Sequence, residues 1–396
     1  MKKTIKVLGV IAVIAVLSFS MIACDNGTTR RQQPTEPTHT HEWGEWTATS
    51  AATETEDGVE TSTCALDSSH KRTRFSGEYA TGTAGLAFEA IGSPATAYSV
   101  SAGTATIGAV HIPAMHRPDA DSPYLPVTSI GSYAFQYCTD LTTVTFAPNS
   151  TLETIGSYAF LYCQSLTSIA IPAGVTSIGS VVFRSCTDLT SITIPASVTS
   201  IGIAAFLSCT NLTTVTFARN STLETIGNVA FQYCESLTSI TIPASVTSLG
   251  TASNSGTDWG VFADCENLTT VTFARNSRLE IIGRGTFASC ESLTNITIPA
   301  SVTYIGDMAL LNCSSLTNIA IPTGVTYIGA GAFGYGPSPT SVTIPAGATV
   351  GAWAFGGWTA SQTINVQGKA NHAATIAAGW DTGWLDDCNA VINYGQ

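Results

Sequence analysis

The most restrictive feature of this sequence is a short pattern that returns along most of the chain. It reads Ile-Gly-x-x-Ala-Phe-x-x-Cys-x-x-Leu-Thr-x-Ile-x-Ile-Pro-x-x-Val-Thr, and it returns after 23, 25 or 31 residues. A period in the twenties is typical of a solenoid, in which each repeat forms one coil and packs only against its neighbours. The pattern therefore predicts one long array rather than several globular domains.

Columns of equivalent residues mark the repeats. A Phe column lies three residues before the cysteines, and a Leu column lies three residues after them. A single repeat has too few apolar side chains to offset the entropy of ordering its backbone, so only a stack is stable. The cysteine column consists of Cys138, Cys163, Cys186, Cys209, Cys234, Cys265, Cys290 and Cys313.

Within one repeat the residue types predict a mainly β coil. Leu189 to Ile194 alternates at its end and is typical of a strand, which Pro195 stops. Val198 to Gly202 predicts a second, shorter extended segment, and the Ala-Phe-x-x-Cys segment predicts a tight helical or 3₁₀ turn. The 25-residue repeats carry a longer turn, as at Phe217 to Glu224, which we expect to leave the strand ladder undisturbed. The 31-residue step holds a polar insertion at 251–258, expected to form a loop.

The repeat motif resembles the BspA-like leucine-rich repeat over about residues 127–350. The resemblance implies a right-handed, curved solenoid with a sheet on its concave side. It also implies a surface protein of the adhesin type, which binds host matrix proteins or other cells without catalysis. Residues 76–126 resemble the leading coil of such arrays and are predicted to be an N-terminal cap, while residues 351–396 are predicted to close the array.

The first residues indicate export. Lys2, Lys3 and Lys6 precede an apolar run, and the segment ends in Met21-Ile22-Ala23-Cys24, which resembles the lipobox of bacterial lipoproteins. The resemblance implies a signal peptide over 1–23 and lipid attachment at Cys24, which would hold the protein on the cell envelope, with its outer surface as the expected location. Plain secretion with cleavage nearby is the alternative. Residues 24–75 are predicted to be a polar tether with a possible small hairpin module.

The outward positions of the longer strands are the candidate binding face. Stacking of the coils would place their side chains together as an uncharged, hydroxyl-rich surface on the concave sheet. Such a surface suits an extended polypeptide or glycan. The alternative explanation is that Thr is a common exposed residue in strands whether or not it binds a ligand. The candidate residues are Thr143, Thr145, Ser168, Ser191, Thr193, Thr214, Thr216, Ser239, Thr241, Thr270 and Thr272, together with Trp259 beside the insertion. Tyrosines that flank the Phe column are further candidate anchors: Tyr133, Tyr137, Tyr158, Tyr162 and Tyr233.

Other motifs support no catalytic or cofactor chemistry. The cysteine column predicts a ladder of buried, inert thiols rather than metal or redox chemistry, because stacked side chains point in parallel and a thiol is readily buried. His39, His41, Cys64 and His70 lack the spacing of a zinc site. Gly329 to Gly334 matches G-x-G-x-x-G only through the repeat's own residues, so no cofactor is predicted.

The sequence therefore predicts a non-enzymatic, lipid-anchored binding protein, either an adhesin or a protein-interaction scaffold. Its expected partner is a surface protein of a host or neighbouring cell, or a glycan. The alternatives are a polysaccharide-binding accessory protein and a structural envelope protein. Nucleic acid is not an expected partner, because the net charge of −12 opposes binding to phosphates.

Overall fold

The structure is a computed structural model that describes residues 47–50, 59–63, 71–75, 82–119, 122–251, 260–336 and 339–395. Cys24 and Trp259 lie outside these residues, as do His39, His41, Cys64, His70 and the insertion from residue 252 onward. The chain divides into two compact units, residues 1–82 and residues 83–396.

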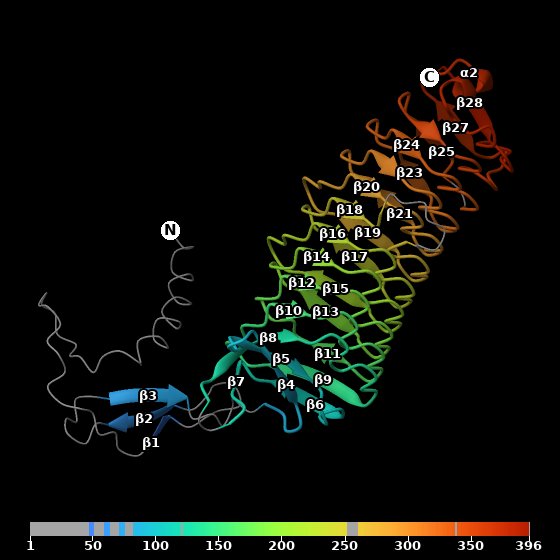
Figure 1. The fold of residues 1–396 in the computed structure, drawn as a ribbon. Coiled ribbons are helices and arrows are strands. Elements are labelled where there is room, and N and C mark those ends of the chain that lie inside the picture. The colour runs from blue at the N-terminus through green and yellow to red at the C-terminus, as the bar shows by residue number, and fades with distance from the viewer. Residues whose placement is uncertain are drawn as a thin grey trace, which may run out of the picture. The chain divides into compact units, whose positions relative to one another are not determined.

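The first unit contains a small antiparallel sheet. Its strands are β1 (Thr47–Ser50), β2 (Val59–Thr63) and β3 (Lys71–Phe75), with β2 in the middle (Figure 1). These strands lie inside the segment predicted to be a tether with a hairpin module.

The second unit is a mainly β solenoid. It begins with the antiparallel pair β4 (Ala87–Ile91) and β5 (Ala97–Ser101). Strand β5 then pairs in parallel with β8 (Leu125–Ile130), and the parallel ladder continues from there along the array. A hairpin therefore covers the first edge of the ladder, where a repeat would have had no neighbour.

From β10 to β26 each coil contributes one short strand to a continuous 13-stranded sheet, which also includes β4, β5, β7 (Met115–His116) and β8. Most short strands come from the Thr-x-Ile or Glu-x-Ile part of a repeat, and each ends in a buried Ile, Leu or Val. The Gly that follows is required by close packing, because a Cβ on Gly202 would lie 2.6 Å from the carbonyl carbon of Gly179. The short strands are β10 (Thr154–Ile155), β12 (Ser177–Ile178), β14 (Ser200–Ile201), β16 (Thr225–Ile226), β18 (Ser248–Leu249), β20 (Ile281–Ile282), β22 (Tyr304–Ile305), β24 (Tyr327–Ile328) and β26 (Thr349–Val350).

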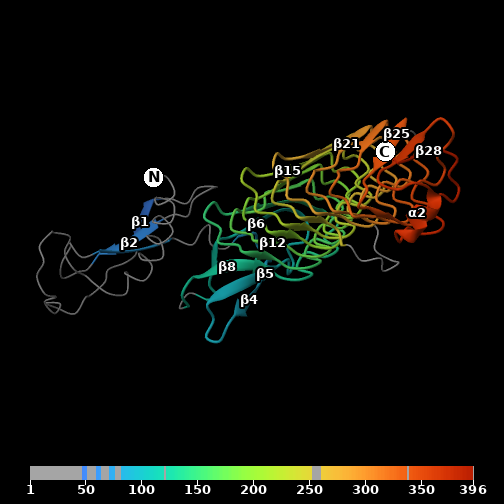
Figure 2. The same cartoon turned by 90° about the horizontal axis from the view of Figure 1, so that it is seen from above.

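The longer strands lie on another side of each coil, as Figures 1 and 2 show, and they form several small sheets instead of one. The sequence led us to expect one continuous sheet from these strands, and this expectation was wrong. The longer strands are β6 (Gly108–Ile112), β9 (Leu141–Phe146), β11 (Ser168–Ile169), β13 (Ser191–Ile194), β15 (Thr214–Phe217), β17 (Ser239–Ile242), β19 (Thr270–Phe273), β21 (Asn295–Thr297), β23 (Asn318–Ala320), β25 (Ser341–Ile344), β27 (Thr363–Val366) and β28 (Val391–Tyr394).

Turn length contributes to these interruptions, which corrects the expectation that the longer turn leaves the ladder undisturbed. Where a longer turn follows a shorter one, as in β13–β15 and β17–β19, four residue pairs form. Where a shorter turn follows a longer one, β19 and β21 share only two pairs, and β15 and β17 share none within the described part of the chain. The strand that leads into the longer turn diverges from its shorter neighbour before the two strands end.

The Ala-Phe-x-x-Cys segments form a third ladder with a different local conformation from the predicted helical turns. Backbone N–H groups alternate between a local bond and a bond to the next coil: Gln136 N donates to Tyr133 O, and Phe135 N donates to Ala159 O. Residues with positive φ recur at two positions per coil, such as Tyr133 (60°) and Tyr137 (62°). A left-handed residue interrupts a right-handed helix, so these segments remain successive turns.

The core is a set of columns that run through the stack. The Phe rings are fully or almost fully buried and lie parallel, with centroids 5.0 Å apart for Phe206–Phe231 and 5.6 Å apart for Phe262–Phe287. The Leu column lies beside them and is buried throughout. Each apolar side chain therefore packs against the same residue type in the coils before and after it.

A tryptophan cluster closes the C-terminal end. Trp358, Trp380 and Trp384 are buried, and the indole N–H groups of Trp358 and Trp380 donate to Phe333 O (2.9 Å) and Ala348 O (2.8 Å). Helix α2 (His372–Ala377) lies in this segment, and the Asn371 side chain accepts a hydrogen bond from Ala374 N at its start. No helix among the described residues is long and apolar enough to cross a bilayer.

We expect Phe206→Ala to lower the free energy of unfolding by about 3–5 kcal/mol, because it leaves a cavity between two stacked rings. Phe206→Leu is the matched control, since Leu310 holds the equivalent buried position in its own coil. The Leu variant should lose clearly less stability in guanidinium unfolding followed by circular dichroism. Equal losses in the two variants would mean that the Phe column is not a principal source of stability.

Candidate binding face

The candidate face is the outward surface of the longer strands, here called the strand face. Its predicted residues point away from the core and alternate with buried Ile or Val, as in the exposed-buried-exposed pattern of Thr214, Val215 and Thr216. Thr143 is half-buried, and the other described candidates are exposed. Parallel pairing places Thr193 beside Thr216 and Thr241 beside Thr272.

A neighbouring Thr column has a structural role instead. The hydroxyl groups of Thr213 and Thr269 donate to the backbone carbonyls of Thr190 (3.0 Å) and Thr238 (2.9 Å) in the preceding coil. These side chains connect adjacent coils. The hydroxyl groups that can serve a ligand are therefore those of the strands themselves, such as Thr214 and Thr216.

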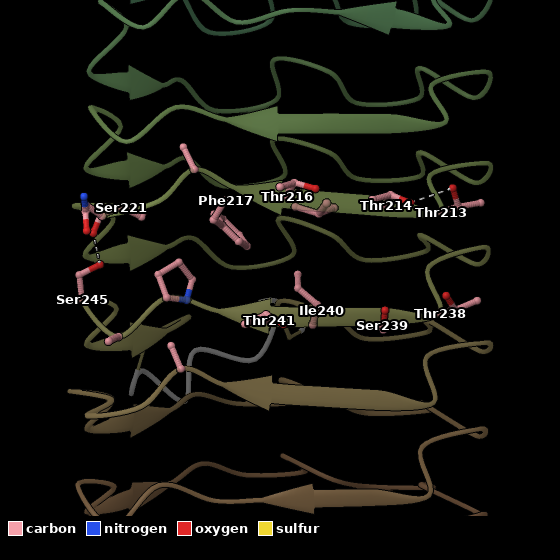
Figure 3. A pocket seen from close by; sticks show the side chains of 16 residues that line it. Thr213, Thr214, Thr216, Phe217, Ser221, Thr238, Ser239, Ile240, Thr241 and Ser245 are labelled. Atoms are coloured by element: carbon pink, nitrogen blue, oxygen red, sulfur yellow. Dashed lines mark hydrogen bonds between the residues drawn. The ribbon is translucent and has the colours of Figure 1, made fainter.

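The strand face is hollowed between β15 and β17 (Figure 3). The depression has a volume of about 540 Å³, and none of its lining residues is ionisable. Hydroxyl groups line it from both strands, and Pro243 and Ala244 add apolar surface at one end. In Figure 3 the ring of Phe217 lies between the strand of Thr216 and the strand of Thr241.

A second depression of about 490 Å³ lies between β19 and β21, and it repeats the first. Thr216, Phe217 and Asn220 in the first site correspond to Thr272, Phe273 and Asn276 in the second. The other sides match as well, with Pro-Ala-Ser from 243 to 245 and again from 299 to 301. The two depressions are therefore two copies of one arrangement.

The alternation of turn lengths produces this arrangement. In both places a longer turn, Phe-Ala-Arg-Asn-Ser, precedes a shorter Ile-Pro-Ala-Ser turn, and the strands diverge between them. Ser245 and Ser301 donate to the carbonyls of Ser221 (3.0 Å) and Ser277 (3.1 Å), which fixes one turn against the other. After β9 the same junction carries Ala170 where the depressions have Thr241 and Thr297.

Asn220 and Asn276 project from the turns of the two depressions. Both have left-handed backbones, with φ of 58° and 60°, and both are exposed. Asn adopts this conformation more readily than most residues. Each amide therefore stands at the rim of a depression, where it can donate and accept hydrogen bonds.

The tyrosines named from the sequence lie on the turns, away from the strand face. Tyr137 is 62 % exposed and Tyr133 is 54 % exposed. They stack in parallel on Tyr162 (5.3 Å between centroids) and Tyr158 (4.8 Å), which are partly buried. Tyr233 is exposed as well.

The eight column cysteines are buried and free. Seven of them donate through Sγ to the backbone carbonyl of a Phe in the preceding coil, as Cys209 does to Phe183 O (3.0 Å). The cysteine thus supplies a small apolar side chain with one weak donor. Burial raises the thiol pKa of Cys209 and Cys313 from 9.0 to about 12, so both remain protonated at neutral pH.

The other motifs lie in ordinary repeat positions. Gly329 follows β24, and its missing Cβ would lie 2.3 Å from Asp307 N, so close coil packing explains this glycine. In the part of the chain that the structure describes, no group of three or more His, Cys, Asp or Glu residues could hold a metal ion.

A family model described as BspA type leucine rich repeat region matches six copies over residues 128–258 and 257–360. The chain belongs to this family. No curated protein matches it. Similar solved structures include a leucine-rich repeat protein of T. pallidum, at 26% identity over 53% of this chain and 89% of that one, with a TM-score of 0.44. A leucine-rich cell surface protein from Faecalibacterium prausnitzii is also 26% identical, over 79% of this chain and 94% of that one, with a TM-score of 0.43.

Sequence reasoning identified the outward residues of this BspA-type array but missed the depressions. Phe217, Pro243 and Ser245 were read only as parts of the repeat. The signal that could have found the site is the alternation of longer and shorter turns, because both depressions lie where a shorter turn follows a longer one.

We expect the column cysteines to resist maleimide at pH 8, because raised thiol pKa values leave almost no reactive thiolate. Cys388 is only partly buried and should react faster. Peptide mass spectrometry after timed labelling would measure each site, and labelling in guanidinium is the positive control. Labelling of Cys209 as fast as that of Cys388 would contradict the buried ladder.

Proposed function

We propose that this protein is a cell-surface binding scaffold of the adhesin type that holds an extended polypeptide across its strand face. The observation that carries the proposal is the duplicated depression. Two equivalent hollows that share Thr, Asn, Phe and Pro-Ala-Ser groups lie on the face that the repeat itself builds. Membership of the BspA-type family supports an interaction role.

The chemistry of the face favours an uncharged ligand segment. The depressions contain no ionisable group, although the whole chain carries a net charge of −12. Hydroxyl groups and backbone can satisfy the amides of a polypeptide, and the Pro, Ala and Phe surfaces can bury apolar side chains. Affinity should therefore depend only weakly on salt.

Anchoring belongs to the same proposal. A lipid on Cys24 would hold the array at the envelope, and residues 25–75 would separate it from the membrane. A scaffold that acts on partners outside the cell needs this display on the outer surface.

We expect Thr216→Lys to weaken saturable binding to polypeptide ligands by about tenfold or more, because a long charged side chain would fill the first depression. The test is a binding screen of the purified protein against arrays of extracellular-matrix proteins and of polysaccharides. Ile203→Lys is the control, since Ile203 is exposed on the turn after Gly202, outside the strand face, and lines neither depression. Binding to polysaccharides alone would replace this function by the polysaccharide-binding alternative.

We expect Cys24→Ala to move the protein from the detergent phase to the aqueous phase in Triton X-114 partition of expressing cells, because the acyl chains would be lost. Protease treatment of intact cells tests display, since an outward array should be degraded. An unchanged partition in the variant would contradict lipid anchoring while leaving the binding face unaffected.

A further inference from the structure

The spacing of the two depressions indicates what kind of polypeptide backbone fits them. They are separated by two coils, because β15 and β19 lead into equivalent turns and β17 lies between them. Adjacent coils repeat at 5.0 Å between the rings of Phe206 and Phe231 and at 5.4 Å between those of Phe231 and Phe262. Two coils therefore span roughly 10 Å, in agreement with twice the usual strand spacing.

A ligand that fills both depressions must present equivalent groups on one side at this interval. In a polyproline II helix every third residue lies on the same side, and three residues rise about 9.3 Å. In an extended β-strand, residues two apart lie on the same face and are about 6.7 Å apart. Residues four apart lie on that face as well and are about 13 Å apart. The polyproline II period is close to the rise of two coils measured at the Phe column, and neither β interval is.

The groups in the depressions match the same backbone. A polyproline II segment makes no internal hydrogen bonds, so its carbonyl oxygens need donors from the binding surface. The hydroxyl groups of Thr216 and Thr241 and the Asn220 amide supply donors in the first depression. Phe217 and Pro243 supply apolar surface for a pyrrolidine ring, the combination by which aromatic-lined sites receive such segments.

The charge and polarity of the lining residues also favour a proline-rich segment. Neither depression has an ionisable lining residue, which fits a proline-rich segment without charges. A pyrrolidine ring buries no polar group. A sugar ring would bring several hydroxyl groups into each depression, and each one left without a partner would cost affinity.

We propose that the two depressions form one bipartite site for a polyproline II segment, in which residues three apart occupy the β15–β17 and β19–β21 depressions. This inference rests on the proposed binding function of the strand face. The segment runs along the solenoid, across the strands, and passes over the paired strands β17 and β19 between the two depressions. Its partner is a protein with an exposed, uncharged proline-rich stretch, which has this backbone.

The test is isothermal titration of the full chain with an oligoproline peptide long enough to cover both depressions. We expect saturable binding that Thr216→Lys and Thr272→Lys each weaken at least about tenfold, because either change removes one half of a bipartite site. Ile203→Lys, at an exposed turn residue outside the strand face, should leave the affinity unchanged. Thr216→Val should weaken binding through loss of a donor without added bulk, and circular dichroism would verify that every variant folds.

A pair of peptides tests the period directly. Proline at every third position, with glycine between, should bind more tightly than proline at every second position in a peptide of equal length. Equal affinity of the two peptides would overturn the inference, as would oligoproline binding that neither Lys variant reduces.

Two further results separate this inference from the proposed function. If a matrix protein binds and Thr216→Lys abolishes that binding while oligoproline does not bind, the strand face remains the site and the polyproline II inference is wrong. If oligoproline and matrix proteins both fail while cellohexaose binds, both proposals are wrong and the glycan alternative replaces them.

Discussion

The whole array depends on backbone hydrogen bonding between one coil and the next. The coils from β4 to β26 pair through the sheet of short strands, and the turn segments add a second set of bonds such as Phe206 N to Ala230 O. Because these bonds connect only neighbouring coils, stability grows with the stack and no coil is independent. The buried columns follow from the same geometry, since identical backbone positions must stack identical side chains, and Phe meets Phe at 5.0–5.6 Å.

This dependence explains several residue choices that otherwise suggest chemistry. The cysteines fit because a thiol is small, tolerates burial and donates to a carbonyl of the preceding coil. The glycine of the Ile-Gly motif fits because a Cβ would collide with the coil before it. Regular spacing of a reactive residue type is thus explained by packing, and burial leaves the thiols protonated.

The proposed binding site lies where the pairing of the longer strands is interrupted. The short strands keep their register along the array, whereas the longer strands divide into several sheets, and β15 and β17 separate where a shorter turn follows a longer one. The resulting hollows are shallow and uncharged, and they repeat because a Phe-Ala-Arg-Asn-Ser turn followed by an Ile-Pro-Ala-Ser turn occurs twice. A repeat protein can in this way build a periodic site without any dedicated insertion, and the period of the coils then selects the period of the ligand.

The sequence by itself determined the solenoid, its mainly β character, the buried Phe, Leu and Cys columns, and the outward direction of residues such as Thr214 and Thr216. These follow from a repeat in which each residue type always occupies the same place in a coil. Only the tertiary structure decided that the short strands form the continuous sheet and that β15 and β17 separate. The reason is that strand pairing depends on how two successive coils fit together. A difference of two residues in the turn of one coil therefore changes the pairing of the next coil. The pattern of a single repeat does not contain this dependence on its neighbour.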